Sequence, residues 1–119
     1  MADYTNFTVE TDADGIALVT WDMPDRSMNV IDVNVGVELA SIIEHVATTD
    51  TIKGAVLCSG KKTFGAGADL SMLEDMLDDF AEQKAKDPEA AAKDLFENAY
   101  ALNKNLRNLE TCGKPWVAA

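Results

Sequence analysis

The part of this chain best suited to chemistry is the glycine-rich stretch SGKKTFGAGADL, residues 59–70. It places three glycines and two alanines between a strand-like run and a helix-like run, so its backbone can approach a ligand closely. Backbone N–H groups at a helix N-terminus lack intrahelical partners and lie at the positive end of the helix dipole, so they suit an anion or a developing oxyanion. A turn that only closes a strand–helix junction explains Gly65 and Gly67 about as well.

The histidine and the cysteines do not indicate a metal site or a nucleophile. His45 is the only histidine, and Cys58 and Cys112 lie far apart in the sequence without a second cluster of metal ligands. We therefore expect no metal site and two free thiols, buried or partly buried. His45 has no serine or cysteine at a spacing known from catalytic triads, so we expect it at the surface or at its boundary.

Length and charge narrow the class of protein further. A chain of 119 residues suits one small domain or part of one. The formal net charge of -11 repels nucleic acid and anionic membranes, so neither is an expected partner. The sequence has no apolar run near the roughly eighteen residues that span a bilayer. Its polar, acidic start, MADYTNFTVE, does not resemble a secretory signal, so we expect a soluble, cytoplasmic protein.

The elements that position the glycine-rich stretch follow from the spacing of apolar residues. Runs 5–11 and 16–22, separated by DADG with its Asp-Gly turn signal, predict an opening β-hairpin. The turn-forming residues of 23–30 predict an exposed loop. Asp32 is a plausible N-cap for a helix, and residues 53–60 predict a buried parallel strand, which together favour a βαβ unit. The helix has one apolar face, formed by Val35, Leu39, Ile42, Ile43 and Val46.

Two further helices are expected after the glycine-rich stretch. The first begins near Asp69 and carries a strongly acidic polar face. Residues 81–90 contain Pro88 and no apolar side chain larger than alanine, so they should break the helical pattern. The next helix ends before Gly113 and Pro115. Its apolar stripe consists of Leu95, Ala99, Leu102, Leu106 and Leu109.

The glycine-rich stretch resembles the signature of the crotonase superfamily, in which a strand, a Gly- and Phe-containing stretch and an A-G-A-D-[LI] turn precede a helix. That signature is nearly whole in residues 60–70. Residues 16–32, 53–60 and 113–119 resemble other family segments in the same order, and only residues 78–98 fall outside the resemblance. It implies an α/β fold with a crotonase-like ββα spiral core. Because the last apolar run, PWVAA, stops abruptly, residues 1–119 are expected to be the N-terminal part of such an acyl-CoA domain, incomplete at its C-terminus.

The resemblance implies a role for the backbone rather than for side chains. In the family, the N–H that follows the Ala-Gly pair donates one of two hydrogen bonds to the thioester carbonyl oxygen, and Ala68 matches this position. Removing one such donor typically costs about 100- to 1000-fold in rate. Asp69 is explained more simply as the N-cap of its helix than as a base. The substrate-binding residues that the resemblance implies are Arg26, Ser27 and Met28, along the pantetheine and adenine of CoA, and Ala66, Gly67, Asp69 and Leu70, which frame the adenine and the thioester.

An acyl-CoA thioester would also need contacts for its phosphates. Basic residues are scarce in this sequence, which has 10 lysines and arginines against 21 aspartates and glutamates. Arg26, Lys61 and Lys62 are therefore reasonable candidates for phosphate contacts. Ordinary surface charge explains these three residues equally well. No separate cofactor is expected for hydration, because CoA is part of the substrate.

The function that the resemblance implies is an enoyl-CoA hydratase module of fatty acid β-oxidation, which converts 2-enoyl-CoA to 3-hydroxyacyl-CoA. The family's two acid–base glutamates and second oxyanion glycine follow the Lys-Pro strand, beyond Ala119, so this chain alone is expected to be inactive. Residues 21–30 and the helical insertion resemble large bacterial multifunctional proteins, which imply a downstream NAD-dependent 3-hydroxyacyl-CoA dehydrogenase region. A homo-oligomer or a multienzyme complex is the expected assembly.

Three alternatives remain open. Another crotonase-fold activity, such as an enoyl-CoA isomerase, an acyl-CoA hydrolase or a decarboxylase, fits the same residues because fold alone does not settle the reaction. The chain could instead be a non-catalytic acyl-CoA-binding or assembly module. The third alternative is an acidic α/β domain whose glycine turn is purely structural.

Overall fold

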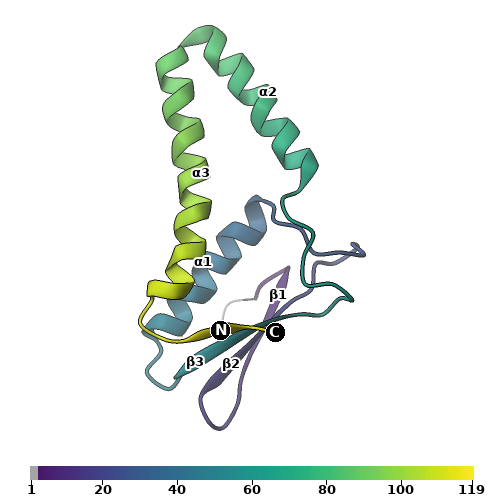
Figure 1. Cartoon of the computed structure of the whole chain (residues 1–119), viewed down its shortest axis with the longest axis vertical. Helices are drawn as coiled ribbons and strands as arrows, with labels where there is room; N and C mark the ends of the chain where they lie inside the picture. The colour runs from purple at the N-terminus through teal and green to yellow at the C-terminus, as the bar shows by residue number, and fades with distance from the viewer. Residues whose placement is uncertain (1–2) are drawn as a thin grey trace.

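The computed structural model describes residues 3–119, which form a four-stranded sheet and three helices (Figure 1). The strands are β1 (Phe7–Thr11), β2 (Ile16–Trp21), β3 (Gly54–Ser59) and β4 (Trp116–Ala118). The helices are α1 (Val33–Thr48), α2 (Leu70–Lys86) and α3 (Pro88–Thr111). The strands lie in the order β1-β2-β3-β4, with β1 antiparallel to β2 and the other two pairings parallel. This is the predicted mixed α/β class.

The opening hairpin is confirmed, and its turn shows why the Asp-Gly signal was informative. The carboxylate of Asp12 accepts hydrogen bonds from the backbone N–H groups of Asp14 and Ile16, at 3.0 and 2.8 Å. Gly15 has a φ of +86°, a left-handed conformation that side chains other than glycine rarely adopt. A Cβ at Gly15 would also lie only 2.5 Å from the carbonyl oxygen of Thr51. The turn therefore requires glycine.

Helix α1 covers one face of the sheet and supplies the centre of the core. Its predicted apolar face is buried as a set, and Asp32 caps it by accepting a hydrogen bond from Val35 N–H at 2.8 Å. The buried side chains of α1 pack with those of the sheet in one cluster, to which the sheet and the loop beside it contribute Phe7, Val9, Ala17, Val19, Trp21, Met23, Ile52 and Ala55.

The other face of the sheet is largely open within the described residues. Leu18, Val56 and Val117 align across β2, β3 and β4, and Leu18 and Val117 are exposed. Figure 1 shows the helices on one side of the sheet only. The prediction of a buried β3 is therefore half right: Gly54 and Ala55 are buried, whereas residues 56–59 are half-buried.

Helices α2 and α3 form an antiparallel pair that projects from the sheet (Figure 1). The chain accordingly measures 55 × 31 × 22 Å, with a radius of gyration of 16.3 Å, whereas about 13–14 Å is usual for a compact chain of this length. The prediction that residues 81–90 break the helix was wrong in extent. Alanine, glutamate, glutamine and lysine keep α2 helical to Lys86, and α3 begins at once with Pro88 in its first turn. Only Asp87 interrupts the helices.

Two polar contacts join α3 and the segment after it to α1. The side-chain amide of Asn105 donates to the carbonyl oxygen of Gly36 at 3.2 Å. The ammonium of Lys114 donates to the carbonyl oxygens of Val46 and Thr49, at 2.7 and 2.6 Å. A cation at the C-terminus of a helix satisfies carbonyl groups that have no intrahelical partner and complements the helix dipole. Lys114 thus fixes the approach of β4 to the sheet.

Candidate functional site

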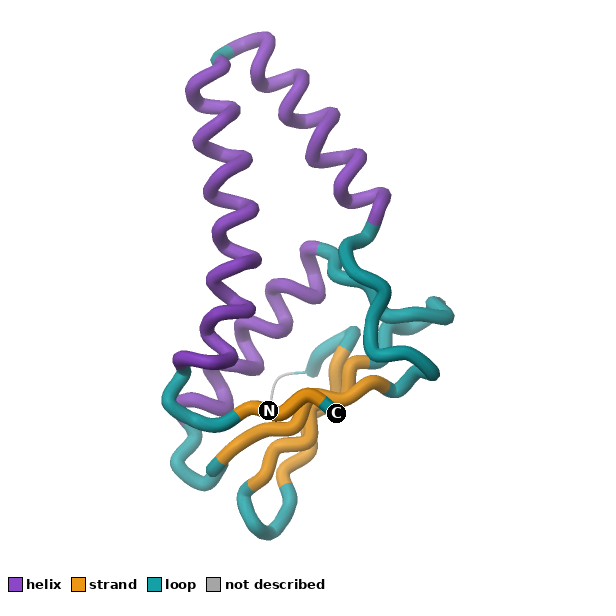
Figure 2. Tube along the Cα trace, in the orientation of Figure 1, coloured by secondary structure: helices purple, strands orange, loops and turns teal. Residues whose placement is uncertain are grey.

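The glycine-rich loop, residues 60–69, runs from the end of β3 to the start of α2 beside the segment that precedes α1 (Figure 2). Three backbone hydrogen bonds of 2.8 Å join the two segments. Ala66 N–H donates to Asn29 O, Ile31 N–H donates to Gly67 O, and Asp69 N–H donates to Ile31 O. The loop is therefore held as a short strand-like segment, paired with residues 29–31 in a parallel bridge.

The N–H of Ala68 is directed away from this pairing. Ala68 is the bridge partner of Ile31, and Ile31 bonds to the residues on either side of Ala68 rather than to Ala68 itself. In parallel pairing, a residue that lies between two bonded neighbours in this way has its own N–H and C=O directed away from the partner strand. Within residues 3–119 no acceptor is hydrogen-bonded to the Ala68 N–H, and the residue is half-buried. This N–H is therefore a backbone donor of the kind that an oxyanion contact requires.

The backbone around Ala68 depends on its neighbours for direction. Gly67 has a φ of +82°, and a Cβ built there would meet no atom within 4 Å. Glycine is therefore required at position 67 because of its backbone conformation, and not because a larger side chain would clash. Asp69, on the other side, is the N-cap of α2, and its carboxylate accepts the Met72 N–H at 3.1 Å. The prediction that Asp69 caps α2 is confirmed, and Ala68 lies immediately before the positive end of the helix dipole.

Asp69 also binds Arg26 from the predicted CoA-binding loop. The guanidinium of Arg26 donates to the carboxylate of Asp69 at 2.6 Å, and Asp69 is buried. The hydrogen bond from Met72 N–H, and then that from Arg26, lower the pKa of Asp69 from its usual value near 3.8, against the opposing effect of burial. Asp69 is therefore ionised at neutral pH and fully engaged, which suits a cap and not a proton donor.

The structure brings the two predicted binding segments together. The Arg26–Asp69 pair places residues 26–28 against the start of α2, where Ala66, Gly67 and Leu70 also lie. Ser27 and Met28 are exposed, as are Ala66, Gly67 and Leu70. The preceding Asp25 has a φ of +59°, a left-handed conformation that aspartate tolerates better than most residues. The binding roles of these residues stay predictions.

The two lysines of the loop differ in what holds them. The ammonium of Lys61 lies 2.7 Å from the carboxylate of Asp22, and only 13% of its side chain is exposed. Gly60 permits this contact, because a Cβ there would lie 2.8 Å from Asp22 Cβ. Lys62 is exposed and takes part in no salt bridge among residues 3–119. Lys62 is therefore more available to a phosphate than Lys61.

Sequence reasoning missed Asn29 as a residue of the site. Its side chain is fully buried, and its carboxamide oxygen accepts the Met23 N–H at 3.0 Å. Its amide group donates to Trp21 O at 2.8 Å, to Ser59 Oγ at 3.0 Å and to Phe64 O at 3.4 Å. The sequence offered only a turn-forming asparagine in an exposed loop, which gives no sign of burial. The carboxamide thus joins the ends of β2 and β3 to the glycine-rich loop.

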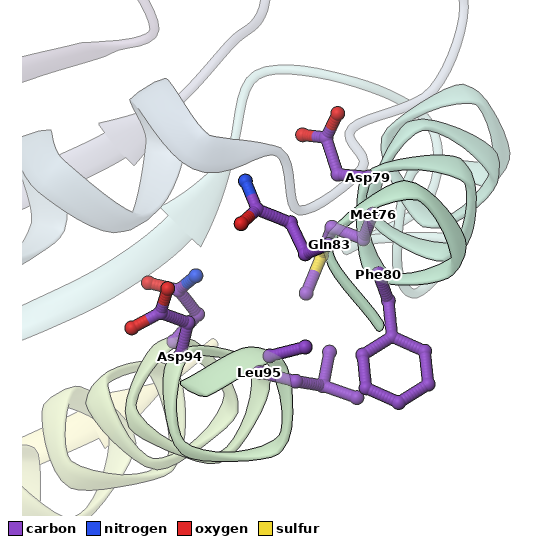
Figure 3. A pocket seen from close by; sticks show the side chains of 8 residues that line it. Met76, Asp79, Phe80, Gln83, Asp94 and Leu95 are labelled. Atoms are coloured by element: carbon purple, nitrogen blue, oxygen red, sulfur yellow. The ribbon is translucent and has the colours of Figure 1, made fainter. Parts of the chain in front are cut away.

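Two cavities lie beside the loop and along α2. A cleft of about 470 Å³ lies between the beginnings of α1 and α2 and is lined by Asp32, Val33, Asn34, Asp69, Met72, Asp75, Met76 and Asp79. Its four aspartates make it unsuitable for phosphate groups. A smaller cavity of about 150 Å³ lies between α2 and α3, where Met76, Phe80 and Gln83 face Asp94 and Leu95 (Figure 3). Ala68 lines neither cavity.

The remaining sequence-based expectations concern metals, thiols and membranes. Among residues 3–119 no group of three or more histidine, cysteine, aspartate or glutamate side chains is placed to hold a metal ion. Cys58 and Cys112 are free and half-buried. His45 lies at the boundary of the core, with Nδ1 3.3 Å from the hydroxyl of Thr49. None of the described helices combines the length and apolar character needed to cross a membrane.

Comparison with known proteins gives relatives in both sequence and structure. The chain is 38% identical over 101 residues to the fatty acid oxidation complex subunit alpha of Shewanella oneidensis, covering 82% of this chain and 14% of the relative. It is 42% identical over 107 residues to the same subunit of Shewanella halifaxensis, covering 89% of this chain and 13% of the relative. The chain thus spans about one seventh of the length of these relatives.

The fold matches a solved structure over almost the whole chain. A putative enoyl-CoA hydratase/isomerase (crotonase) from Legionella pneumophila superposes with a TM-score of 0.74 at 21% identity, covering 98% of this chain and 40% of that one. At this identity the match concerns the fold, and it confirms the predicted crotonase-like architecture. No protein-family profile matches the chain.

Proposed function

We propose that this chain belongs to the crotonase (enoyl-CoA hydratase/isomerase) superfamily and forms part of an enoyl-CoA hydratase module of fatty acid β-oxidation. The reaction adds water to 2-enoyl-CoA and gives 3-hydroxyacyl-CoA. The observation that carries the proposal is the Ala68 N–H, which is directed away from its bridge partner, has no acceptor within residues 3–119 and precedes the N-terminus of α2. Support also comes from the relatives, which are named as subunits of a fatty acid oxidation complex.

The role of Ala68 in this reaction is electrostatic. Addition of hydroxide at the β-carbon pushes electrons onto the thioester carbonyl oxygen and gives an enolate-like state, and a proton then adds at the α-carbon. The Ala68 N–H donates to that oxygen, and the hydrogen bond strengthens as negative charge develops. The small side chain of Ala68 leaves the oxygen free to approach. This donor therefore stabilises the transition state more than the substrate.

Hydration also requires a general base and a general acid. Asp69 is the carboxylate next to Ala68, but it is committed to Met72 N–H and Arg26, and its pKa is lowered. A carboxylate in that state does not deliver a proton at neutral pH. We assign no acid or base among residues 3–119, and we expect this chain alone to bind an acyl-CoA thioester without hydrating it.

The CoA moiety is proposed to lie over the loop that contains residues 26–28. Arg26 keeps 44% of its side chain exposed although it binds Asp69, so part of its guanidinium remains open to a phosphate. Lys62 provides a second exposed cation, and Met28, which is 48% exposed, offers an apolar surface for pantetheine. These contacts supply binding energy remote from the reacting carbonyl.

Two ligands that differ only in the carbonyl group test the proposal. Crotonyl-CoA carries the thioester oxygen, whereas the thioether S-(but-2-enyl)-CoA lacks it. We expect calorimetric titration to show about 2- to 10-fold tighter binding of the thioester, which is the worth of one net hydrogen bond. Failure of the chain to bind either compound would refute the proposal.

Activity is tested on the complete polypeptide that contains this segment. We expect it to consume the conjugated double bond of crotonyl-CoA and to form 3-hydroxybutyryl-CoA. Formation of a 3-enoyl-CoA would instead indicate an isomerase, and release of free CoA would indicate a thioester hydrolase. Binding without turnover by the complete polypeptide would indicate a non-catalytic acyl-CoA-binding protein.

Assembly and cofactor use belong to the complete polypeptide. The relatives are named as the alpha subunit of a complex, and we propose a multienzyme complex for the parent of this chain as well. A downstream dehydrogenase region would take NAD, and the hydratase region would need no cofactor. NAD use, homo-oligomer formation and a cytoplasmic location remain predictions from the sequence.

A further inference from the structure

The proposed oxyanion donor, the Ala68 N–H, lies in a loop between β3 and α2. The direction of this N–H therefore depends on contacts that the loop makes with other segments. Among residues 3–119, the part of this loop around Ala68, residues 66–69, pairs through its backbone with residues 29–31, by the three hydrogen bonds of 2.8 Å. The direction of the Ala68 N–H therefore depends on the placement of a second loop, which itself lies between β2 and α1. A rotation of residues 29–31 would rotate the Ala68 peptide with them.

Asn29 is the residue that fixes this second loop. Its fully buried side chain links two distant parts of the sequence. It bonds to the backbone of Trp21 and Met23 at and after the end of β2, to Ser59 at the end of β3 and to Phe64 in the glycine-rich loop. Buried amides with satisfied donors and acceptors hold their surroundings in one arrangement, because any rotation leaves a polar group unpaired.

Ser59 extends this restraint into the first half of the glycine-rich loop. Its hydroxyl accepts from the Asn29 amide at 3.0 Å and from Lys61 N–H at 3.0 Å, and it donates to Thr63 O at 2.6 Å. The Ser59 hydroxyl therefore bonds to two backbone groups of the turn that residues 59–63 form. Asn29 contacts this hydroxyl and the loop directly.

The ring of Trp21 packs against the same loop. Its ring lies 3.0 Å from where a Cβ of Gly65 would be, and Phe64 packs edge-on against it with ring centroids 6.1 Å apart. Trp21 also provides the carbonyl oxygen that the Asn29 amide binds. The Trp21 ring thus packs against the loop, and the Asn29 side chain, which bonds to the Trp21 carbonyl oxygen, holds the loop by hydrogen bonds.

We propose that Asn29 is a positioning residue for oxyanion binding, which aligns the Ala68 N–H by bonding the ends of β2 and β3 to both loops. The assignment rests on the proposed function, because it concerns the same thioester contact. Asn29 touches no substrate: it acts through residues 29–31 and through Ser59, each of which is bonded to the loop that contains Ala68.

The test uses the 119-residue chain, with crotonyl-CoA and S-(but-2-enyl)-CoA as ligands. In Asn29→Ala we expect the preference for the thioester to be lost, so that thioester binding weakens by the wild-type preference of about 2- to 10-fold while thioether binding stays within about 2-fold of wild type. Ser59→Ala retains the bonds of Asn29 to Met23 and Trp21, so it should lose about 3-fold in the same direction. If Asn29→Ala does not fold, the ligand preference of Ser59→Ala tests the proposal instead.

A spectroscopic measurement and a control separate positioning from general destabilisation. The infrared carbonyl band of bound crotonyl-CoA, labelled with carbon-13 at the carbonyl, should lie at lower frequency than in solution and should move back toward the solution value in both variants. Val46→Ala removes core volume far from the loop and should lower the melting temperature without changing the band or the ligand preference.

The outcomes separate this assignment from the proposed function. Wild-type protein that binds neither ligand, or both equally, overturns the proposed function and the role of Asn29 with it. A wild-type preference that survives in Ser59→Ala and in folded Asn29→Ala overturns the role of Asn29 alone. Equal loss of both ligands in these variants also overturns it, because a merely structural residue would give that result.

Discussion

Replacing Gly67 by alanine isolates the conformational requirement of the residue before Ala68, the proposed oxyanion donor. Gly67 has a φ of +82°, and an added Cβ would meet no atom within 4 Å, so the substitution introduces backbone strain without a clash. An L-residue in the left-handed region costs about 1–2 kcal/mol. Alanine also restricts the unfolded chain, which returns about 0.4–1 kcal/mol. The expected net loss of stability is therefore about 1 kcal/mol, or about 4 °C in melting temperature.

The chain offers two matched controls for this substitution. Gly113, which follows α3, has a φ of +91° and equally open surroundings, so Gly113→Ala should cost the same stability far from the loop. Gly36 lies inside α1, also without an atom within 4 Å, but it has no positive φ. Gly36→Ala should therefore stabilise the protein by about 0.5–1 kcal/mol, because alanine has the higher helix propensity.

Binding distinguishes the two destabilised variants. Relief of the strain in Gly67→Ala turns the peptides on either side of residue 67, one of which carries the Ala68 N–H, so most of the preference for crotonyl-CoA over S-(but-2-enyl)-CoA, about 2- to 10-fold in wild type, should be lost. Gly113→Ala should keep the wild-type preference. Urea denaturation and calorimetric titration of the three variants measure both effects. The reasoning is refuted if Gly67→Ala is as stable as wild type, or if it loses stability but keeps the full preference.

Two further predictions concern the contacts that hold the site and the sheet. The pKa of Asp69 is lowered in the folded state, so its contribution to stability is present above its unfolded value near 3.8 and disappears as the pH falls through the lower folded value. Asp69→Asn should therefore lose stability at neutral pH and show a shallower decline under acid, and urea midpoints that fall as steeply as those of wild type would contradict this. Lys114→Met removes the donor for two carbonyl groups at the end of α1 and should cost about 1.5–3 kcal/mol in urea denaturation, whereas the exposed control Lys104→Met should change stability by less than about 0.5 kcal/mol. Equal effects of the two lysine variants would show that the Lys114 contacts are not stabilising.

The elements of this protein could be predicted because their signals are local. The Asp-Gly turn, the caps Asp32 and Asp69, and the apolar spacing of α1 each act within a few residues of where they are read. Such signals are visible without knowledge of the fold. The helical break is shorter than predicted because residues 81–90, although they have no apolar side chain larger than alanine, are mostly alanine, glutamate, glutamine and lysine, which have high helix propensity.

The site itself depends on contacts that the sequence does not display. Residues 29–31 and 66–69 are separated by more than thirty positions. Their pairing directs the Ala68 N–H away from Ile31, and no acceptor in the described part of the chain binds it. The burial of Asn29 and the pairing of Lys61 with Asp22 likewise arise only when the ends of β2 and β3 meet.

The sequence by itself thus determined that residues 59–70 form a glycine-rich link between a strand and a helix, with small side chains around an exposed backbone. That information resides in residue size and local conformational preference. The tertiary structure alone decided the direction of the Ala68 N–H, because parallel pairing with a distant loop occupies the N–H groups of Ala66 and Asp69, turns that of Ala68 to the opposite side and leaves it without an acceptor among residues 3–119.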